Sequence, residues 1–285
     1  MASSRSRAIT DPDPASGAGT IRGEAAGVVF ERTGGPGAGP PLLLVHGLGA
    51  SLRIWDPQVA RLARERDVIA VDMPGFGDSP LLTGGESPTP WALAAALARL
   101  CDELGIERPH VAGNSLGGWV AIEMAKRDEV STLCLISPAG LWRRPLGPRA
   151  RDTRGVAKRL KPLVGPLVRS RRGREALLRT TAARPALIPP GEARELITTW
   201  IDAPGYDAAN AEMRAHICTD LDRVAVPTTI AWGEHDRLLS PARPERRPPG
   251  SRFLILDECG HTPNWDEPEL IAELLLEASA AGVVA

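Results

Sequence analysis

The amino-acid sequence predicts an α/β fold built around a largely parallel sheet. Continuous apolar runs of the kind found in buried parallel strands occur at residues 41–45 and 67–72, and each ends in a glycine-containing turn. Segments with the helical spacing of apolar residues, such as 51–64 and 91–104, separate these runs. Strands that alternate with helices are typical of parallel sheets. The 285 residues, 43% of them hydrophobic, suffice for one large domain or for a domain with a smaller insertion.

The N-terminal part of the chain supplies a predicted tail and the first strands. Residues 1 to about 20 are rich in Ser, Ala, Gly, Asp and Pro without periodicity, which predicts a flexible tail. A strand is expected at 27–32, and the Gly/Pro run at 34–40 predicts a hairpin-type connection after it. The next predicted elements are the buried strands already named, a tight turn at 73–79, the helix 91–104 with Gly105 as its C-cap, and a strand at 130–137.

No strand is predicted between residues 142 and 221, where Arg, Pro and Ala are frequent and segments with helical spacing, such as 192–201, occur. We interpret residues 142–221 as a helical cap or lid inserted into a core of residues 21–141 and 222–285. The remaining predicted elements are strands at 226–233 and 252–257 and a helix at 268–279.

Ser115 lies at the centre of Gly113-Asn114-Ser115-Leu116-Gly117, between a predicted strand and a predicted helix. A Cβ at either glycine would collide with neighbouring backbone as the chain reverses, so the spacing predicts a nucleophile elbow with a strained, exposed serine. The helix would direct its N-terminus, with the N–H of Leu116, to where an oxyanion develops during attack on a carbonyl. Because G-x-S-x-G also occurs by chance, its meaning depends on the rest of the chain.

A serine hydroxyl is a weak nucleophile, so a catalytic Ser115 needs an imidazole to take its proton and a carboxylate to orient that imidazole. His261 follows a predicted strand and is the best of five histidines. Asp236 follows the strand that ends at Gly233 and is one candidate for the acid. Glu234 and Asp257 are the rival acids, and His46, His110, His216 and His235 are the histidines in less suitable positions.

Several motifs in a fixed order resemble the α/β-hydrolase superfamily, in its group with a cap inserted after the sixth strand. They are His46-Gly47-Leu48-Gly49, Asp72-Met73-Pro74-Gly75-Phe76-Gly77-Asp78-Ser79, Gly113-Asn114-Ser115-Leu116-Gly117, Gly233-Glu234-His235-Asp236 and Gly260-His261. The resemblance covers the chain from about Gly27 to the C-terminus. It implies a mostly parallel eight-stranded sheet with helices on both faces and an inserted helical cap.

The resemblance also implies roles for single residues. The family order of serine, acid and histidine fits Ser115, Asp236 and His261, and the acid stands three residues after the glycine at Gly233. The N–H of Leu48 would join that of Leu116 in the oxyanion hole. Asp72 is interpreted as structural, because an aspartate can bind the amides of a glycine-containing turn.

The predicted cap contains two tryptophans, Trp142 and Trp200, that would line an apolar substrate pocket or belong to the core of the cap. Between Arg143 and Arg179 there are thirteen Lys or Arg residues and two acids, Asp152 and Glu175. This run would attract an anionic substrate or partner, or form a solvated surface; the second interpretation is favoured.

Composition restricts the classes of partner. The formal net charge of −1 gives no global argument for nucleic-acid binding, and no run of 18 apolar residues predicts a membrane span. The four cysteines form no C-x-x-C, and no secretion signal is recognised, so a cytoplasmic protein is expected. The predicted chemistry needs neither a metal nor an organic cofactor. Self-association is left open.

The sequence therefore predicts a serine hydrolase that cleaves a carboxylic ester or similar acyl bond of a small, mainly apolar substrate through an acyl-enzyme. Haloalkane dehalogenases and epoxide hydrolases of this superfamily carry an aspartate in place of Ser115. Carbon–carbon hydrolases of vinylogous diketones are the main alternative, although Thr262 and Thr198-Thr199-Trp200 depart from their pattern of a Trp after the histidine and an arginine before the cap Trp. A cofactor-free perhydrolase is a third option, and a non-enzymatic ligand-binding protein is disfavoured.

Overall fold

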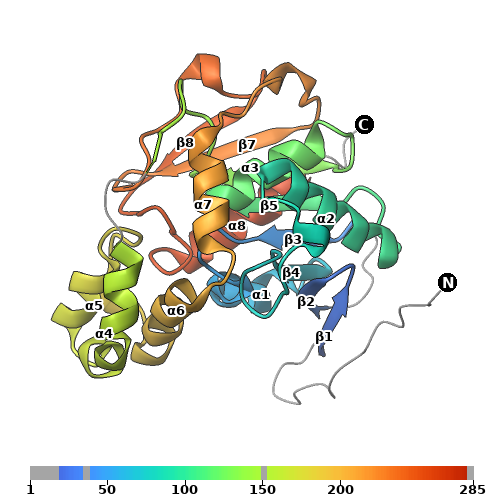
Figure 1. The fold of residues 1–285 in the computed structure, drawn as a ribbon. Helices are drawn as coiled ribbons and strands as arrows, with labels where there is room; N and C mark the ends of the chain where they lie inside the picture. Colours follow the sequence, from blue (N-terminus) through green and yellow to red (C-terminus); the bar gives the residue numbers. More distant parts are fainter. Residues whose placement is uncertain (1–18, 35–38, 149–152, 281–285) are drawn as a thin grey trace.

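The computed structural model describes residues 19–34, 39–148 and 153–280, and these residues form an eight-stranded sheet with helices on both faces (Figure 1). The strand order is β1-β2-β4-β3-β5-β6-β7-β8. β2 is antiparallel to β1 and β4, and every other neighbouring pair is parallel, which confirms the predicted sheet. The strands are β1 Thr20–Ala25, β2 Val28–Thr33, β3 Leu42–Val45, β4 Val68–Asp72, β5 His110–Asn114, β6 Thr132–Ile136, β7 Thr228–Gly233 and β8 Arg252–Leu256.

The helices follow the predicted segments closely, except that the segment 51–64 divides into a 3₁₀ helix, η1, and a short α-helix. Within the described ranges, no helix combines the length and the apolar character of a membrane-spanning segment. The helices are η1 Leu52–Trp55, α1 Asp56–Leu62, α2 Pro90–Glu103, α3 Leu116–Ala125, α4 Thr153–Val168, α5 Arg171–Leu178, α6 Pro190–Asp202, α7 Tyr206–Ala215 and α8 Pro268–Ala280, with short 3₁₀ turns η2 Thr83–Gly85, η3 Pro185–Leu187, η4 Leu221–Arg223 and η5 Pro244–Arg246.

The sheet is the middle of three layers. Successive side chains of a strand point to opposite faces, and in β3 Leu43 and Val45 pack in one cluster with α2 and α3. Leu42 and Leu44 pack in a second cluster with α1 and α8. Because both faces of the central strands are covered, β3, β4, β5, β6 and β7 are buried at every position and mostly apolar, which is why they appear as nearly continuous apolar runs in the sequence.

The prediction was wrong at the N-terminal edge of the sheet. The run at 34–40, of which 35–38 lie outside the described residues, is not a hairpin connection, because β3 pairs with β4 and β5 rather than with β2. The hairpin joins β1 to β2 through the turn at Ala26 and Gly27. β1 has few buried side chains and was therefore not recognised. The predicted tail falls outside the described residues up to 18, and its last residue, Thr20, begins β1.

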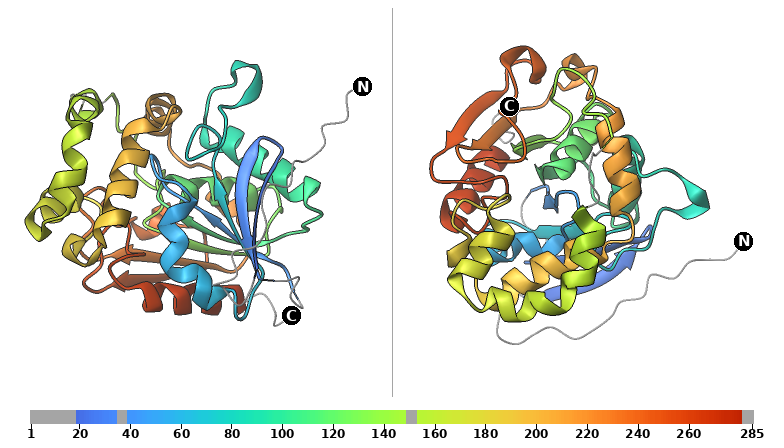
Figure 2. Two further views of the ribbon diagram at one scale, coloured as in Figure 1. Left: turned by 90° about the horizontal axis from the view of Figure 1, so that it is seen from below. Right: turned by 60° about the vertical axis from the view of Figure 1, so that its left-hand side comes forward.

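Helices α4 to α7 lie between β6 and β7, and we refer to residues 142–221 as the insertion. Figures 1 and 2 show α4, α5 and α6 grouped at one end of the molecule. These three helices share a small core, whereas α7 packs into the α2–α3 side of the main core. The division of the chain into a core and a cap domain stays a prediction. The buried residues of the small core are Val164, Val168, Leu178, Ala182, Ile188, Ala193, Ile197 and Ile201.

Asp266 ties the insertion to the loop after β8. Its buried carboxylate accepts backbone hydrogen bonds from Gly260 (2.8 Å), Ala183 (2.9 Å) and Arg184 (2.8 Å). Gly260 belongs to the loop after β8, and the other two residues belong to the insertion. A single side chain therefore satisfies buried amides from both segments, which would otherwise cost free energy.

A second contact between the insertion and the core is electrostatically unfavourable at neutral pH. Asp56, at the start of α1, lies 3.5 Å from Arg53, and α6 brings Glu192 and Glu195 close to it. Burial raises the pKa of Asp56 to about 6, with Arg53 opposing the shift and the charges of Glu31, Glu192 and Glu195 adding to it. The ionised carboxylate is thus destabilising in the folded chain.

We expect Asp266→Ala to lower the free energy of unfolding by about 3 kcal/mol, because it leaves one buried and two partly buried N–H groups without their acceptor. The free energy of unfolding of Asp266→Asn should lie between those of Asp266→Ala and the wild type, because the NH₂ group of asparagine replaces one of the two accepting oxygens. Urea unfolding followed by tryptophan fluorescence measures both effects. Asp257→Ala, at an exposed position, is the control and should change stability by less than about 0.5 kcal/mol. Equal losses for Asp257→Ala and Asp266→Ala would contradict the proposed role.

Asp56→Asn should stabilise the protein in a pH-dependent way. The folded pKa of about 6 lies above the ordinary aspartate value of 3.8, so wild-type stability falls as pH rises through this interval while the variant is spared that loss. The Asp56 side chain is 36% exposed, so solvent screens its charge in part. We therefore expect Asp56→Asn to raise the free energy of unfolding by only about 1 kcal/mol at pH 8. Below pH ~4 the two proteins should unfold alike. A variant less stable than wild type at pH 8 would refute this assignment.

Candidate active site

Ser115 lies between β5 and α3 with φ 53° and ψ −115°, a conformation that non-glycine residues rarely adopt. Close backbone packing holds it there. A Cβ on Gly113 would overlap the carbonyl of Gly117, and a Cβ on Gly117 would overlap the carbonyls of Val45 and His46. The predicted sharp turn is therefore present, and Leu116, directly after Ser115, is the first residue of α3. The prediction of an exposed serine was wrong, because the turn after β3 packs on Ser115 and leaves it only 8% exposed. The Ser115 side chain lies where the N-terminal N–H groups of α3 are free of intrahelical partners.

The turn after β3 lies against Ser115. A Cβ on Gly47 would be 3.2 Å from the Cβ of Ser115 and 3.0 Å from Oδ1 of Asn114. Leu48, the predicted second oxyanion donor, is the next residue of this turn and packs against the main core. The structure thus brings the segments of Leu48, Ser115 and Leu116 together at the carboxyl ends of β3 and β5.

His46 holds this turn and is not available as a base. Its Nδ1 donates to the Gly47 carbonyl (2.7 Å), and its Nε2 accepts from the Met73 N–H (3.0 Å). Burial lowers the pKa of His46, although the charge of Asp72 and the Gly47 carbonyl act in the opposite direction. A neutral ring with both nitrogens bonded is a structural group.

His261 and Asp236 form a buried pair. Nδ1 of His261 lies 2.8 Å from Oδ2 of Asp236, and the two side chains are 6% and 1% exposed. Oδ1 of Asp236 accepts the N–H groups of Leu238 (2.8 Å) and Leu239 (2.9 Å). Burial alone would raise the pKa of Asp236, but the hydrogen bond and charge of His261, together with these two amides, hold it below its usual range. The carboxylate therefore fixes the ring with Nδ1 protonated and leaves Nε2 as an acceptor.

The loops of Asp236 and His261 meet through their backbones. A Cβ on Gly233, at the end of β7, would overlap the carbonyls of Cys259 and Gly260. The N–H of His235 donates to the carbonyl of Cys259 at 2.8 Å. Glycine at 233 thus permits the close approach that places the acid loop beside the histidine loop.

Asn114 is a residue whose role the sequence did not reveal. Its side chain is buried and donates to the backbone carbonyls of His261 (2.9 Å) and Ile136 (3.2 Å). Asn114, the residue before Ser115, is therefore bonded directly to the backbone of His261. Among the described residues this bond links the two segments, and no hydrogen bond joins the Ser115 hydroxyl to the imidazole of His261. The signal in the sequence was a polar residue at the end of a buried strand. Its partner lies 147 residues away, beyond any local pattern.

The rival residues lie elsewhere. Glu234 and Glu258 flank His235 at 3.8 and 3.7 Å, and all three side chains are exposed. Their ligand atoms lie within 4.8 Å of one another, which makes them the group among the described residues with metal-ligand spacing. Asp257 is exposed on the loop after β8.

The remaining polar residues named from the sequence have structural partners. Asp72 accepts the N–H groups of Leu52 (2.7 Å) and Asp78 (2.9 Å), in agreement with a structural role. His110 is bonded to Thr132 Oγ1 (2.9 Å) and His216 to the Glu212 carbonyl (2.9 Å).

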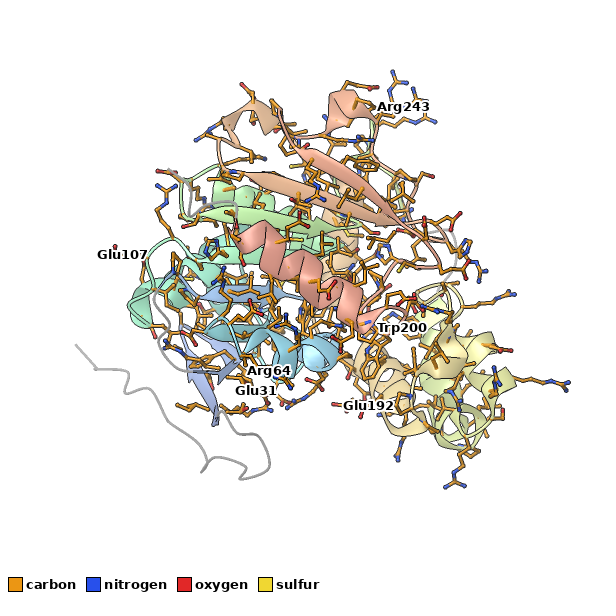
Figure 3. The ribbon with its side chains drawn as sticks, turned by 180° about the vertical axis from the view of Figure 1, so that it is seen from behind. Glu31, Arg64, Glu107, Glu192, Trp200 and Arg243 are labelled. Carbon is orange, nitrogen blue, oxygen red and sulfur yellow. The ribbon has the colours of Figure 1, made fainter. Side chains whose placement is uncertain are left out.

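The two tryptophans of the insertion occupy different environments. Trp200 meets the turn after β3, because a Cβ on Gly49 would lie 2.6 Å from its Cδ1 and 2.9 Å from Cδ2 of Tyr206. Figure 3 shows Trp200 where α6 reaches the core. Trp142 instead packs edge to face on Trp119 of α3, with ring centroids 5.7 Å apart, and donates to the His216 carbonyl (2.9 Å). Its part in substrate binding stays a prediction.

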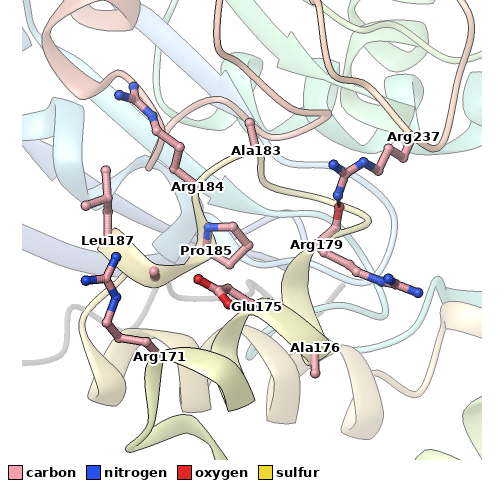
Figure 4. Close-up of a pocket in the computed structure, with 10 residues that line it drawn as sticks. Arg171, Glu175, Ala176, Arg179, Ala183, Arg184, Pro185, Leu187 and Arg237 are labelled. Carbon is pink, nitrogen blue, oxygen red and sulfur yellow. Dashed lines mark hydrogen bonds between the residues drawn. The ribbon is translucent and has the colours of Figure 1, made fainter.

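A surface hollow of about 610 Å³ lies outside this constellation (Figure 4). It is bounded by α5, η3 and Arg237, and the guanidinium group of Arg237 donates to the Arg179 carbonyl at 2.8 Å. Its charged lining consists of Arg171, Glu175, Arg179, Arg184 and Arg237. The hollow is therefore a basic part of the insertion surface and contains none of Ser115, His261 or Asp236.

Known proteins share this architecture. The model of the alpha/beta hydrolase family matches residues 42–274. The pimeloyl-[acyl-carrier protein] methyl ester esterase of Neisseria meningitidis serogroup B is 30% identical over 273 residues, which are 89% of this chain and 98% of that protein. The epoxide hydrolase EphH of Mycobacterium tuberculosis is 32% identical over 198 residues, 64% of this chain and 91% of that protein. A thermophilic esterase from Thermogutta terrifontis superposes with a TM-score of 0.66 at 28% identity, covering 96% of this chain and 97% of the esterase. With its sheet, its turn at Ser115 and this match, the chain belongs to the alpha/beta hydrolase family.

Proposed function

We propose that this hydrolase cleaves a carboxylic ester, or a similar acyl bond, of a small and mainly apolar substrate by a serine mechanism. The observation that carries the proposal is the buried His261–Asp236 pair, together with the hydrogen bond from Asn114, the residue before Ser115, to the His261 carbonyl. Ser115 is the nucleophile, His261 the base and Asp236 the group that orients it. The ester class also agrees with the esterase relatives, and the serine disfavours the aspartate chemistry of epoxide hydrolases.

The reaction follows from these positions. Ser115 Oγ attacks the carbonyl carbon as its proton passes to Nε2 of His261, and Asp236 stabilises the imidazolium that forms. The tetrahedral intermediate breaks its bond to the leaving alcohol, which takes the proton from Nε2 and departs. A water molecule then attacks the acyl-enzyme with His261 again as base, and the acid is released with Ser115 regenerated.

The developing negative charge requires donors on one side of the carbonyl. We assign this role to the N–H groups of Leu48 and Leu116. The position of Leu116 at the N-terminus of α3 supports the assignment, because the helix dipole favours an anion there. The contact of the 47–49 turn with Ser115 supports the part of Leu48.

The insertion supplies the wall that decides which acyl group fits. Trp200 and Tyr206 reach Gly49, one residue beyond Leu48, so an apolar acyl group bound near the oxyanion donors would meet these rings. This placement supports a substrate role for Trp200 and the interpretation of the insertion as a lid. It also agrees with the small exposed fraction of Ser115 (8%) and His261 (5%).

We retain the cytoplasmic location as part of the proposal. The four cysteines are free and buried, and burial raises the pKa of each thiol to about 12. Unpaired, unreactive thiols agree with a reducing compartment.

Ser115→Ala should reduce kcat/KM for p-nitrophenyl esters by on the order of 10³-fold or more, because it removes the attacking oxygen. The same change should abolish labelling by a fluorophosphonate and leave the circular dichroism spectrum intact. Ser87→Ala, at an exposed serine, serves as the matched control and should retain turnover. Wild-type turnover by Ser115→Ala would exclude the covalent mechanism.

Asp236→Asn should reduce kcat by on the order of 10³- to 10⁴-fold, since an amide favours the wrong tautomer of His261. Because the pKa of Asp236 is held low by His261 and two amides, its carboxylate stays ionised on mild acidification, so wild-type activity should not be lost through protonation of Asp236 in that range. Kinetics of Glu234→Gln and Asp257→Asn provide the controls. If either control were inactive while Asp236→Asn kept its rate, the acid would have been misassigned.

A further inference from the structure

The outer side of α4 exposes a row of large aliphatic side chains. Val156 is 56% exposed, Leu160 51%, Leu163 51% and Leu167 45%. Their spacing of four, three and four residues places them on one line along the helix, about 16 Å long. We call these four residues the α4 stripe.

The stripe is separate from the face with which α4 joins the insertion. Val164 and Val168 are buried in the small core, and Arg154 is buried through bonds to the Trp200 carbonyl (3.2 Å) and to Asp207 (2.6 Å). These residues already attach α4 to α6 and α7. The stripe therefore takes no part in the packing of the insertion. Figures 1 and 2 show α4 at the outer end of the molecule. Exposed apolar rows of this size usually mark an interaction surface.

The segment that carries the stripe is strongly basic. At about 100° per residue Arg159 lies roughly 70° from the centre of the stripe, whereas Lys158 lies on the other side of α4. Glu175 is the only acidic residue between positions 153 and 179, against nine basic residues. Several of these cations are exposed and bond to no other described side chain, so their charge is not neutralised locally. These exposed, unpaired cations are Lys158, Arg159, Arg169, Arg171 and Arg172. The net charge of −1 for the whole chain conceals this local excess.

We propose that the α4 stripe, with Arg159 beside it and the other exposed cations of the same segment nearby in the sequence, docks the protein on an anionic lipid surface. An amphipathic helix with leucines on one side and Lys or Arg beside them has the composition of a helix that lies in the membrane interface. The leucines would enter the boundary between headgroups and acyl chains, while the cations meet lipid phosphates. A lipid surface needs no complementary shape, which suits a single outward-facing helix.

Two other occupants fit less well. A second copy of this chain would bring two strongly basic faces together, and like charges oppose such a contact. A protein partner is less suited because the stripe contains no aromatic residue, whereas the residues that dominate protein interfaces are enriched in Trp, Tyr and Arg, with Leu and Val under-represented. Charge complementarity therefore selects an anionic membrane. This inference does not depend on the proposed catalytic mechanism.

Flotation with lipid vesicles tests the proposal on the full chain carrying Ser115→Ala, so that hydrolysis cannot alter the vesicles. We expect binding to vesicles of equal parts phosphatidylglycerol and phosphatidylcholine, and at least about tenfold weaker binding to phosphatidylcholine alone. Leu160→Gln with Leu163→Gln should weaken binding on the order of tenfold, and Arg159→Gln, which removes the cation beside the stripe, should weaken it about fivefold. Leu270→Gln, which alters a leucine 41% exposed on α8, is the matched control and should bind like its parent.

The outcomes separate the occupants. Loss of binding between about 0.05 and 0.5 M NaCl, together with the selective effect of the leucine variant, would support docking through both charge and burial. Absence of vesicle binding, or binding unchanged by Leu160→Gln with Leu163→Gln, would overturn the proposal. Concentration-dependent dimers in light scattering that disappear in the leucine variant would assign the stripe to a second copy instead. Circular dichroism checks that each variant is folded.

Discussion

At the carboxyl edge of the sheet, the backbone of one loop packs directly on the backbone of the next, with glycine at each contact. Gly117 faces the carbonyl groups at the end of β3, and Gly233 faces those of the loop after β8. No side chain fits between these segments, so the positions of Ser115, Asp236 and His261 are set by the main chain rather than by long, mobile side chains. Such rigid placement is what a reaction through several groups requires.

Buried polar side chains complete this arrangement by satisfying backbone groups. His46, Asp72, Asn114 and Asp266 each bond to backbone atoms of a segment distant in the sequence. A buried polar group of this kind is costly when it loses a partner, so each one selects a single arrangement of two loops. The site is therefore supported by residues that take no part in the chemistry proposed for it.

The sequence was informative where a local pattern reflects a physical requirement. The apolar runs predicted the buried strands because both faces of the sheet are covered, and the Gly-x-Ser-x-Gly spacing predicted the turn at Ser115 because the backbone there admits no Cβ. β1 was missed because a hairpin edge strand buries few side chains. Asn114 and Asp266 could not be assigned, because their partners are backbone atoms of loops that only the folded chain brings near. The acid was chosen by family position, and a pattern alone left Glu234 and Asp257 in competition.

The small core shared by α4, α5 and α6 has a consequence for the dynamics of the protein. These helices bury most of their apolar residues against one another, and they attach to the rest of the chain through the bonds of Asp266 and the contacts of Leu196 and Trp200 with the core. A segment built in this way opens as a cooperative unit at a lower free energy than the sheet, so its amides exchange with solvent sooner than those of β5 or α3. With the function proposed above, substrate selection and chemistry would belong to parts of the chain that differ in local stability.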